Sequence, residues 1–150
     1  MSVLIQDHNW IVTTVIALFG IIAVHRLTEK RSKAIEFRAA AKEFRNIVLN
    51  ELKGIYPSVT NWPQCPSALL TTKFNTLQIA AMEFSASLPW YRRFMFKRAW
   101  RIYCVGTNPV SKEATQEYHQ YMGFTIDNHY INPQKRLKEN IDRLLKYSKT

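Results

Sequence analysis

Five cations and no acid lie within the stretch WYRRFMFKRAWRIY, which runs from Trp90 to Tyr103. These cations are Arg92, Arg93, Lys97, Arg98 and Arg101. On a helix such like charges repel one another at three- and four-residue spacing, so a compensating group is expected nearby. Guanidinium groups contact phosphate in a bidentate manner and also stack on bases. We predict that the five residues bind an anionic, phosphate-bearing ligand, with a solvated basic face as the competing interpretation.

The aromatic residues of the same stretch lead to a different interpretation. Phe96, Ala99, Trp100 and Tyr103 follow the i, i+3, i+4, i+7 spacing of one helix face. An apolar stripe of this kind is typical of a face packed on a core. We therefore expect these four residues to build the domain rather than to contact a ligand.

Other chemistry-bearing residues form no recognisable set. Cys65 and Cys104 are expected to be free, buried and reduced, since neither belongs to a CxxC pair. His119 and His129 are ten positions apart with no Glu or Cys completing a metal site. No glycine-rich phosphate loop or nucleophile motif is present. We expect no enzyme, cofactor or metal centre, and the net charge of +10 favours an anionic partner.

The segment Trp10–Val24 contains no charged residue and is interpreted as a membrane span. A spanning helix needs roughly 20 apolar residues, whereas Asn9 to Val24 supplies about 16. Val3–Ile5 could complete the span, and Arg26 could extend its side chain toward the interface at the other end.

Three other interpretations of this segment are less favourable. A secretory signal peptide needs a basic N-terminal region and a small-residue cleavage site, and neither is found. A core helix that is apolar all round needs a larger protein to bury it. A surface helix would need a charged face.

The basic residues around the span predict its orientation. Four follow it closely, namely Arg26, Lys30, Arg31 and Lys33, and none precedes it. The positive-inside rule then places the N-terminus outside and the remainder in the cytoplasm. We therefore predict a transmembrane anchor over residues 1–25 and a cytoplasmic domain over residues 26–150.

The cytoplasmic part has helical periodicity throughout, which predicts an all-α fold. A long helix within residues 26–55 carries an apolar stripe from about Lys30 to Lys53, and it can continue from the membrane helix. Further helices are predicted from about Ser67 to Leu88 and from Trp90 to Cys104. A short helix capped by Ser111 and a final helix capped by Asn132 follow, with loop or short strand between them.

The arrangement resembles a group of uncharacterised single-span bacterial proteins with a small helical cytoplasmic domain. The resemblance is carried by FRAAAKEF, FKRAWRIY and RLKENIDRLLKYSK, which begin at Phe37, Phe96 and Arg136. The architecture is also similar to that of the membrane-anchored effectors of type III CRISPR systems. That similarity covers size, span, orientation and the basic cytoplasmic part, and no binding residue is carried over from it.

The second resemblance implies a single-pass protein of the bacterial inner membrane that binds cyclic tetra-adenylate. It also implies a homo-oligomer, specifically a tetramer, that perturbs the membrane in antiviral defence. One alternative is a structural or partner-binding membrane protein whose basic face contacts anionic lipid. Another is a membrane-tethered nucleic-acid binder, which would depend steeply on salt concentration.

Overall fold

The computed structural model describes residues 3–107, 118–123, 125–126, 129–130 and 132–149. Four α-helices occur in this part of the chain: α1 (Val3–Glu51), α2 (Pro66–Ser87), α3 (Trp90–Val105) and α4 (Pro133–Leu145). Two 3₁₀ turns, η1 (His119–Tyr121) and η2 (Lys146–Ser148), flank α4 in sequence. A minimal antiparallel pair joins β1 (Thr125–Ile126) to β2 (His129–Tyr130). The described residues are all-α apart from this pair, as the periodicity predicted.

The chain divides into two compact units, Met1–Glu36 and Phe37–Thr150. In the first unit, every described side chain from Val12 to Glu36 is exposed. These exposed residues include Ile16 at 66% and Phe19 at 70% of their full accessible area. An apolar helix without a protein partner is what a lipid environment accommodates. Within the described residues, α1 is the one helix long and apolar enough to cross a membrane.

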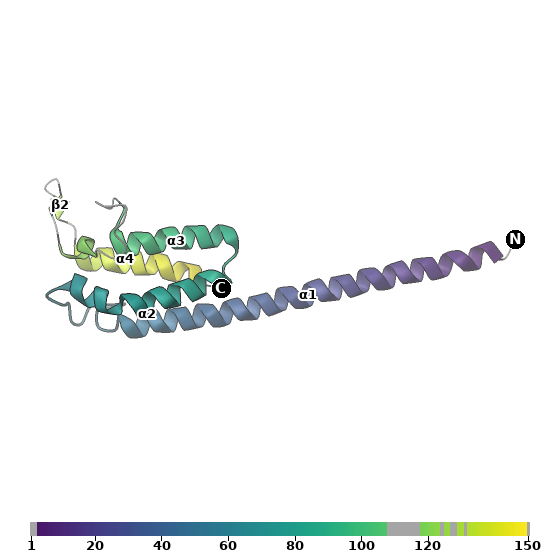
Figure 1. Cartoon of the computed structure of the whole chain (residues 1–150), viewed down its shortest axis with the longest axis horizontal. Coiled ribbons are helices and arrows are strands. Elements are labelled where there is room, and N and C mark those ends of the chain that lie inside the picture. Colours follow the sequence, from purple (N-terminus) through teal and green to yellow (C-terminus); the bar gives the residue numbers. More distant parts are fainter. Residues whose placement is uncertain (1–2, 108–117, 124, 127–128, 131, 150) are drawn as a thin grey trace. The chain divides into compact units, whose positions relative to one another are not determined.

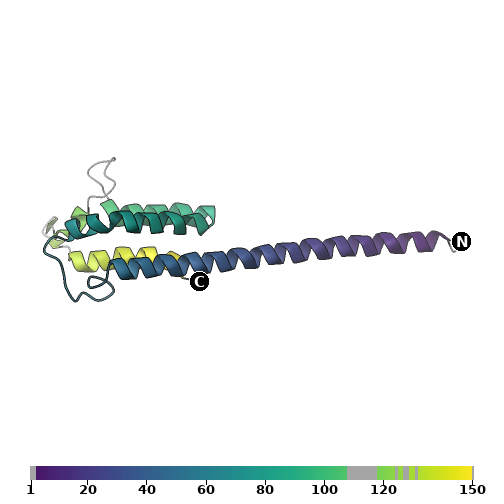
Figure 2. The ribbon, with the colours of Figure 1, turned by 60° about the horizontal axis from the view of Figure 1, so that its bottom comes forward.

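The second unit packs four helical segments in two pairs. Figure 2 shows α2 and α3 in one layer and α4 with the C-terminal part of α1 in the other. Figure 1 shows α3 and α4 as neighbours in the same unit. The helices therefore enclose a single core between the two layers.

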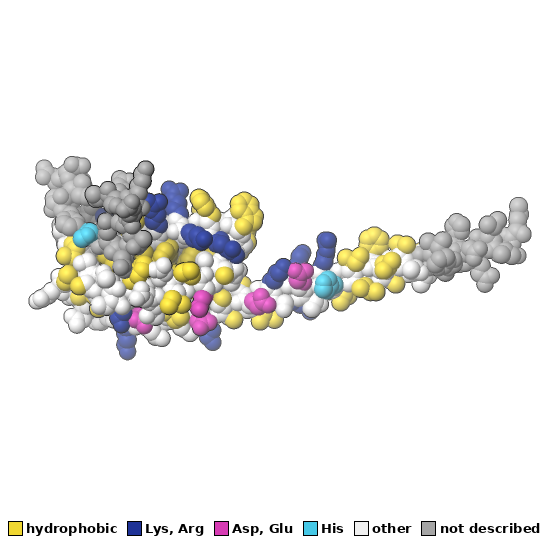
Figure 3. Space-filling view, viewed as in Figure 1, with side chains coloured by type: hydrophobic (Ala, Val, Ile, Leu, Met, Phe, Trp, Pro, Cys, Tyr) yellow, Lys and Arg dark blue, Asp and Glu magenta, His cyan; other side chains and the backbone are white. Residues whose placement is uncertain are grey.

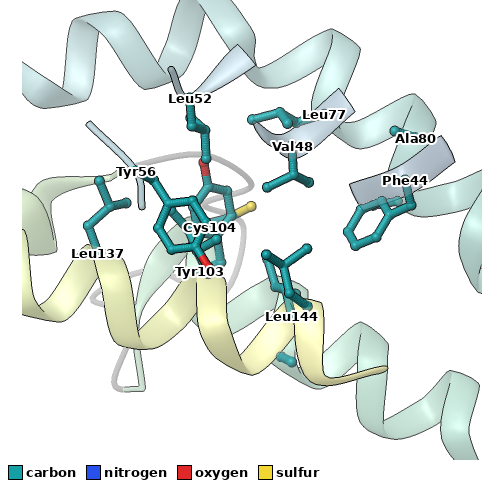
Figure 4. Packing of buried hydrophobic residues seen from close by; sticks show 14 of the residues in the cluster. Phe44, Val48, Leu52, Tyr56, Leu77, Ala80, Tyr103, Cys104, Leu137 and Leu144 are labelled. Atoms are coloured by element: carbon teal, nitrogen blue, oxygen red, sulfur yellow. The ribbon is translucent and has the colours of Figure 1, made fainter. Parts of the chain in front are cut away.

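The core is built from the apolar stripes that the spacing predicted. Figure 4 shows Phe44 and Val48 of α1 opposite Leu144 of α4, with Leu77 of α2 close by. The Phe44 ring stacks on Phe84 of α2, with ring centroids 4.8 Å apart. Phe96 of α3 packs edge-on against both rings, with centroids 5.5 Å from Phe44 and 5.2 Å from Phe84. Burial of such side chains contributes about 1.5–3 kcal/mol each, and this packing holds α3 in place.

The helix boundaries agree with local sequence signals. Helix α2 begins at Pro66 and ends just before Leu88 and Pro89, because proline removes a donor and disfavours a helical residue before it. Asn132 caps α4, accepting hydrogen bonds from the backbone N–H groups of Gln134 and Lys135 at 3.0 and 3.2 Å. The Asn132 cap confirms the predicted start of α4, and α2 begins within one residue of the predicted Ser67.

Helix α1 ends at Glu51, within two residues of its predicted end, and the turn after it contains Gly54 with a φ of 92°. One part of the prediction differs from the structure. Of the stretch predicted to be helical from Ser111 to about Met122, the described residues form a 3₁₀ turn over His119–Tyr121, preceded by Tyr118 with a left-handed φ of 44°. Ser111 itself lies outside the described residues.

Candidate anion-binding site

Helix α3 carries all five predicted ligand-binding cations. Its first residue follows Pro89, which is also where the chain reverses after α2. Phe96, Ala99 and Tyr103 are buried and Trp100 is partly buried, so the stripe predicted to face the core does so. The remaining faces of α3 determine which cations are available.

Arg93 is committed to the end of α2. Its guanidinium donates to the backbone carbonyls of Ser85, Ala86 and Leu88 at 2.9, 2.8 and 3.3 Å. The last carbonyls of a helix lack internal partners, and a basic side chain can satisfy them. Arg93 therefore closes the α2–α3 corner.

Arg92 is also used within the fold. Its Nη2 donates to the backbone carbonyl of Tyr147 at 3.1 Å. Its guanidinium carbon lies 5.5 Å from the centre of the Phe37 ring, at cation–π distance. Arg92 thus joins α3 to the start of the second unit and to the C-terminal turn η2.

These contacts explain two cations that the sequence left without a structural role. Arg92 and Arg93 are half-buried, and their charge is balanced by carbonyl dipoles and a ring face. Sequence reasoning missed this because it searched for acids and phosphates as compensating groups. A cation one turn after a proline-terminated helix was the available signal, since it can reach back to the preceding carbonyls.

The other three cations form the candidate site. Lys97, Arg98 and Arg101 are exposed. At 100° per residue they fall within an arc of about 100° on α3. Ion pairs in the described part of the chain join Lys33 to Glu29, Lys73 to Glu51 and Lys138 to Asp142, and none includes these three cations. We call Lys97, Arg98 and Arg101 the cationic end of α3.

Two shallow hollows border the cationic end. Lys97 lies at one of about 160 Å³ between α2 and α3, which is lined by Met82, Phe96 and Trp100 among others. Arg98 and Arg101 lie at another of about 200 Å³, next to Gly106 and Thr107. Hollows of this size fit a phosphate group or the edge of one base rather than a whole cyclic oligonucleotide.

The first turns of α3 carry a surface that sequence reasoning missed. Trp90, Tyr91 and Phe94 are exposed at 82%, 56% and 71% of their full accessible area. They lie on the same side of the helix as Arg98, to which Trp90 and Phe94 are related by steps of four. Figure 3 shows protruding hydrophobic side chains beside basic ones over α3. We call Trp90, Tyr91 and Phe94 the aromatic end of α3.

The signal for this surface was present in the spacing. The aromatic end does not fall on the face of Phe96, Ala99 and Tyr103, which is the face packed on the core. A set of large apolar residues outside the core stripe is therefore expected to be exposed.

The C-terminal end of α3 is fixed by the segment before α4. Gln120 donates from Nε2 to the carbonyls of Ile102 and Tyr103 at 2.7 and 2.9 Å. The Tyr121 hydroxyl donates to the Tyr103 carbonyl at 2.9 Å and accepts from Asn140 of α4 at the same distance. Both ends of α3 are thus hydrogen-bonded to other segments of the second unit.

Other reactive groups lie away from α3's exposed face. Cys65, expected to be buried, is exposed before α2, and hydrogen bonds from Ser67 and the Ala68 backbone lower its pKa. Cys104 is buried, which raises its pKa to about 12. Among the described residues no three His, Cys, Asp or Glu side chains are grouped to hold a metal ion.

No family model matches the chain, and no curated protein or solved structure is detectably similar to it. Its class therefore follows from the fold alone. In the part that the structure describes, it is a helical protein whose long first helix, α1, is a candidate membrane span near the N-terminus, and the three shorter helices α2, α3 and α4 follow it.

Proposed function

We propose that this chain is a membrane-anchored, non-enzymatic binding protein whose cationic end recognises phosphate groups. The observation that carries the proposal is the exposure of Lys97, Arg98 and Arg101 on an acid-free helix, with no ion pair to them among the described side chains. Closely spaced unpaired cations repel one another, and a ligand phosphate relieves that repulsion while gaining charge-assisted hydrogen bonds.

An anionic nucleotide is the first candidate ligand, specifically cyclic tetra-adenylate, bound in antiviral defence. Each hollow at the cationic end accommodates one phosphate or base edge, so a cyclic ligand with several phosphates suits several copies of the chain around it. A tetramer would also bring four spans together, which a membrane-perturbing effector requires because one span cannot form a pore. The ligand would act only by binding the perturbing state more tightly than the resting state.

Anionic lipid is the second candidate source of phosphate. The exposed aromatic end favours it, because tryptophan and tyrosine prefer the membrane–water interface. In this case the protein is a structural or partner-binding protein of the inner membrane, with its C-terminal unit on the cytoplasmic side.

Equilibrium binding to the full-length chain in single-copy and multi-copy nanodiscs tests the proposal. One arm titrates cyclic tetra-adenylate into neutral-lipid nanodiscs that hold the protein, and the other measures recruitment of anionic vesicles to the same nanodiscs. Two variants with equal loss of charge are compared. The first is Lys97→Gln/Arg98→Gln/Arg101→Gln, and its control replaces three exposed lysines elsewhere, Lys53, Lys135 and Lys146, by Gln.

The proposal predicts that the α3 variant loses binding at least tenfold more than the control in one arm, since about 1.4 kcal/mol corresponds to tenfold. The arm that responds identifies the source of phosphate. Equal losses for both variants in both arms would mean that the charge acts non-specifically, and the site would be abandoned.

A further inference from the structure

We infer that the aromatic end of α3 inserts into the interface of the bilayer that the protein is anchored in. This inference rests on the proposed membrane anchoring, but not on which phosphate the cationic end binds. It starts from the exposure of Trp90, Tyr91 and Phe94, which do not belong to the buried core. Three large neighbouring aromatics at more than half exposure leave a patch that water solvates poorly.

The neighbouring surface of α2 enlarges the apolar patch. Ile79 and Met82 are exposed at 58% and 63%, and Met95 of α3 at 56%. Met82 also lines the hollow between the two helices, together with Lys97. Both helices of the α2–α3 pair therefore expose large apolar side chains.

Charge and apolar surface are arranged along α3 in the order that an interface requires. The aromatic end occupies the first turns, and the cationic end follows on the same side of the helix. Phe94 and Arg98 are about 6 Å apart along the helix axis at 1.5 Å per residue. If the N-terminal end of α3 enters the bilayer interface first, the aromatic rings reach the upper acyl chains and the cations reach the headgroup phosphates.

Chain connection keeps this patch close to a bilayer. Arg92 contacts the ring of Phe37, so the first turn of α3 lies where the chain enters the second unit. About 13 residues separate Phe37 from Val24, the last apolar residue of the span. They reach roughly 20 Å as a helix and at most about 45 Å extended. Whatever the arrangement of the two units, the patch stays within reach of the membrane at a high effective concentration.

A second copy of the chain is a less suitable occupant. A two-fold contact would place the patch against itself. Helix α3 carries no acid, so the cations of both copies would be brought together without compensation. An anionic lipid surface instead complements the same charges.

A polarity-sensitive fluorophore placed at the patch tests the inference. Met95→Cys combined with Cys65→Ser is labelled with a nitrobenzoxadiazole dye in the full-length chain, and Cys104 stays unlabelled because it is buried. The control is the wild-type chain labelled at Cys65, which is exposed before α2. Both are reconstituted at one copy per nanodisc, in neutral lipid with a minority of phosphatidylglycerol, with and without brominated acyl chains.

The inference predicts blue-shifted emission and several-fold stronger bromine quenching for the patch label than for the control label. Adding Trp90→Ser and Phe94→Ser should abolish the difference. These side chains are exposed, so the changes should leave the melting temperature of the second unit unchanged.

Other outcomes separate this inference from the proposed anchoring. Extraction of the protein from membranes by alkaline carbonate would overturn the anchoring itself. Stable insertion with equal quenching at both labels would overturn the inference alone. A blue shift that appears only in discs with several copies, without bromine quenching, would assign the patch to self-association.

Discussion

Replacing Arg93 by alanine is expected to destabilise the second unit, although Arg93 belongs to a cluster that looks like a ligand site. Its guanidinium contacts the carbonyls of Ser85, Ala86 and Leu88 at the end of α2. Hydrogen bonds that involve a charged group each contribute about 1.5–3 kcal/mol when well shielded. Because Arg93 is only half-buried and water can replace part of its contacts, we expect a total loss of about 1–3 kcal/mol.

The expected loss corresponds to a fall in Tm of roughly 5–15 °C for a unit of this size. Near-ultraviolet circular dichroism of the full-length protein in non-ionic detergent measures it, because the aromatic core supplies the signal while the span stays helical. Arg98→Ala is the matched control. It removes the same side chain from an exposed position and should change the unfolding free energy by less than about 0.5 kcal/mol.

Arg93→Lys should recover less than half of the loss, since an ammonium group lacks the planar fork that reaches several carbonyls. Equal melting temperatures for Arg93→Ala and Arg98→Ala would refute the structural role given to Arg93. That result would return Arg93 to the group of candidate ligand contacts.

Three further predictions concern groups outside the exposed face of α3. Cys65 should react with a thiol reagent in the native protein while Cys104 reacts only on unfolding, as mass spectrometry of the labelled peptides would establish. Tyr121→Phe should lower the free energy of unfolding by about 1–3 kcal/mol in a thermal melt, because it leaves a buried amide and a carbonyl with fewer partners. The hydrogen bond from Tyr56 lowers the pKa of Asp142, so this carboxylate stabilises the fold above its unfolded pKa of about 4. That contribution is below about 1 kcal/mol because about half of the Asp142 side chain is exposed. It should disappear as the pH falls from about 4 through the lowered pKa of the folded state. Asp142→Asn should lack it at every pH in parallel melts.

The helices were predictable because their signals are local. Pro66 lies at the start of α2, Pro89 separates α2 from α3, and Asn132 caps the start of α4. Each acts on only one or two neighbouring residues. The apolar stripes identified the core for the same reason, since the spacing of Phe44 and Val48 directly defines one helix face.

The candidate site was only partly predictable from the sequence. Which cations are used within the fold and which are free to bind a ligand depends on contacts between helices. Five adjacent cations look alike in sequence, yet Arg93 is committed through the α2–α3 corner and Arg92 through Phe37 and Tyr147. The network that fixes the other end of α3 joins Tyr121 to Asn140 across the unit, and no spacing rule indicates it. Cys65 was expected to be buried because free cysteines usually are. Its place just before the start of α2 leaves it exposed.

The most direct test of the proposed function is the affinity of the full-length chain for cyclic tetra-adenylate in multi-copy nanodiscs of neutral lipid, whose surface carries no net negative charge to compete. If nucleotide is the ligand, the wild type and the lysine control should bind with similar affinity. The variant Lys97→Gln/Arg98→Gln/Arg101→Gln should bind at least tenfold more weakly. Identical titrations for all three proteins, together with unchanged recruitment of anionic vesicles, would contradict a phosphate-binding role for the cationic end of α3.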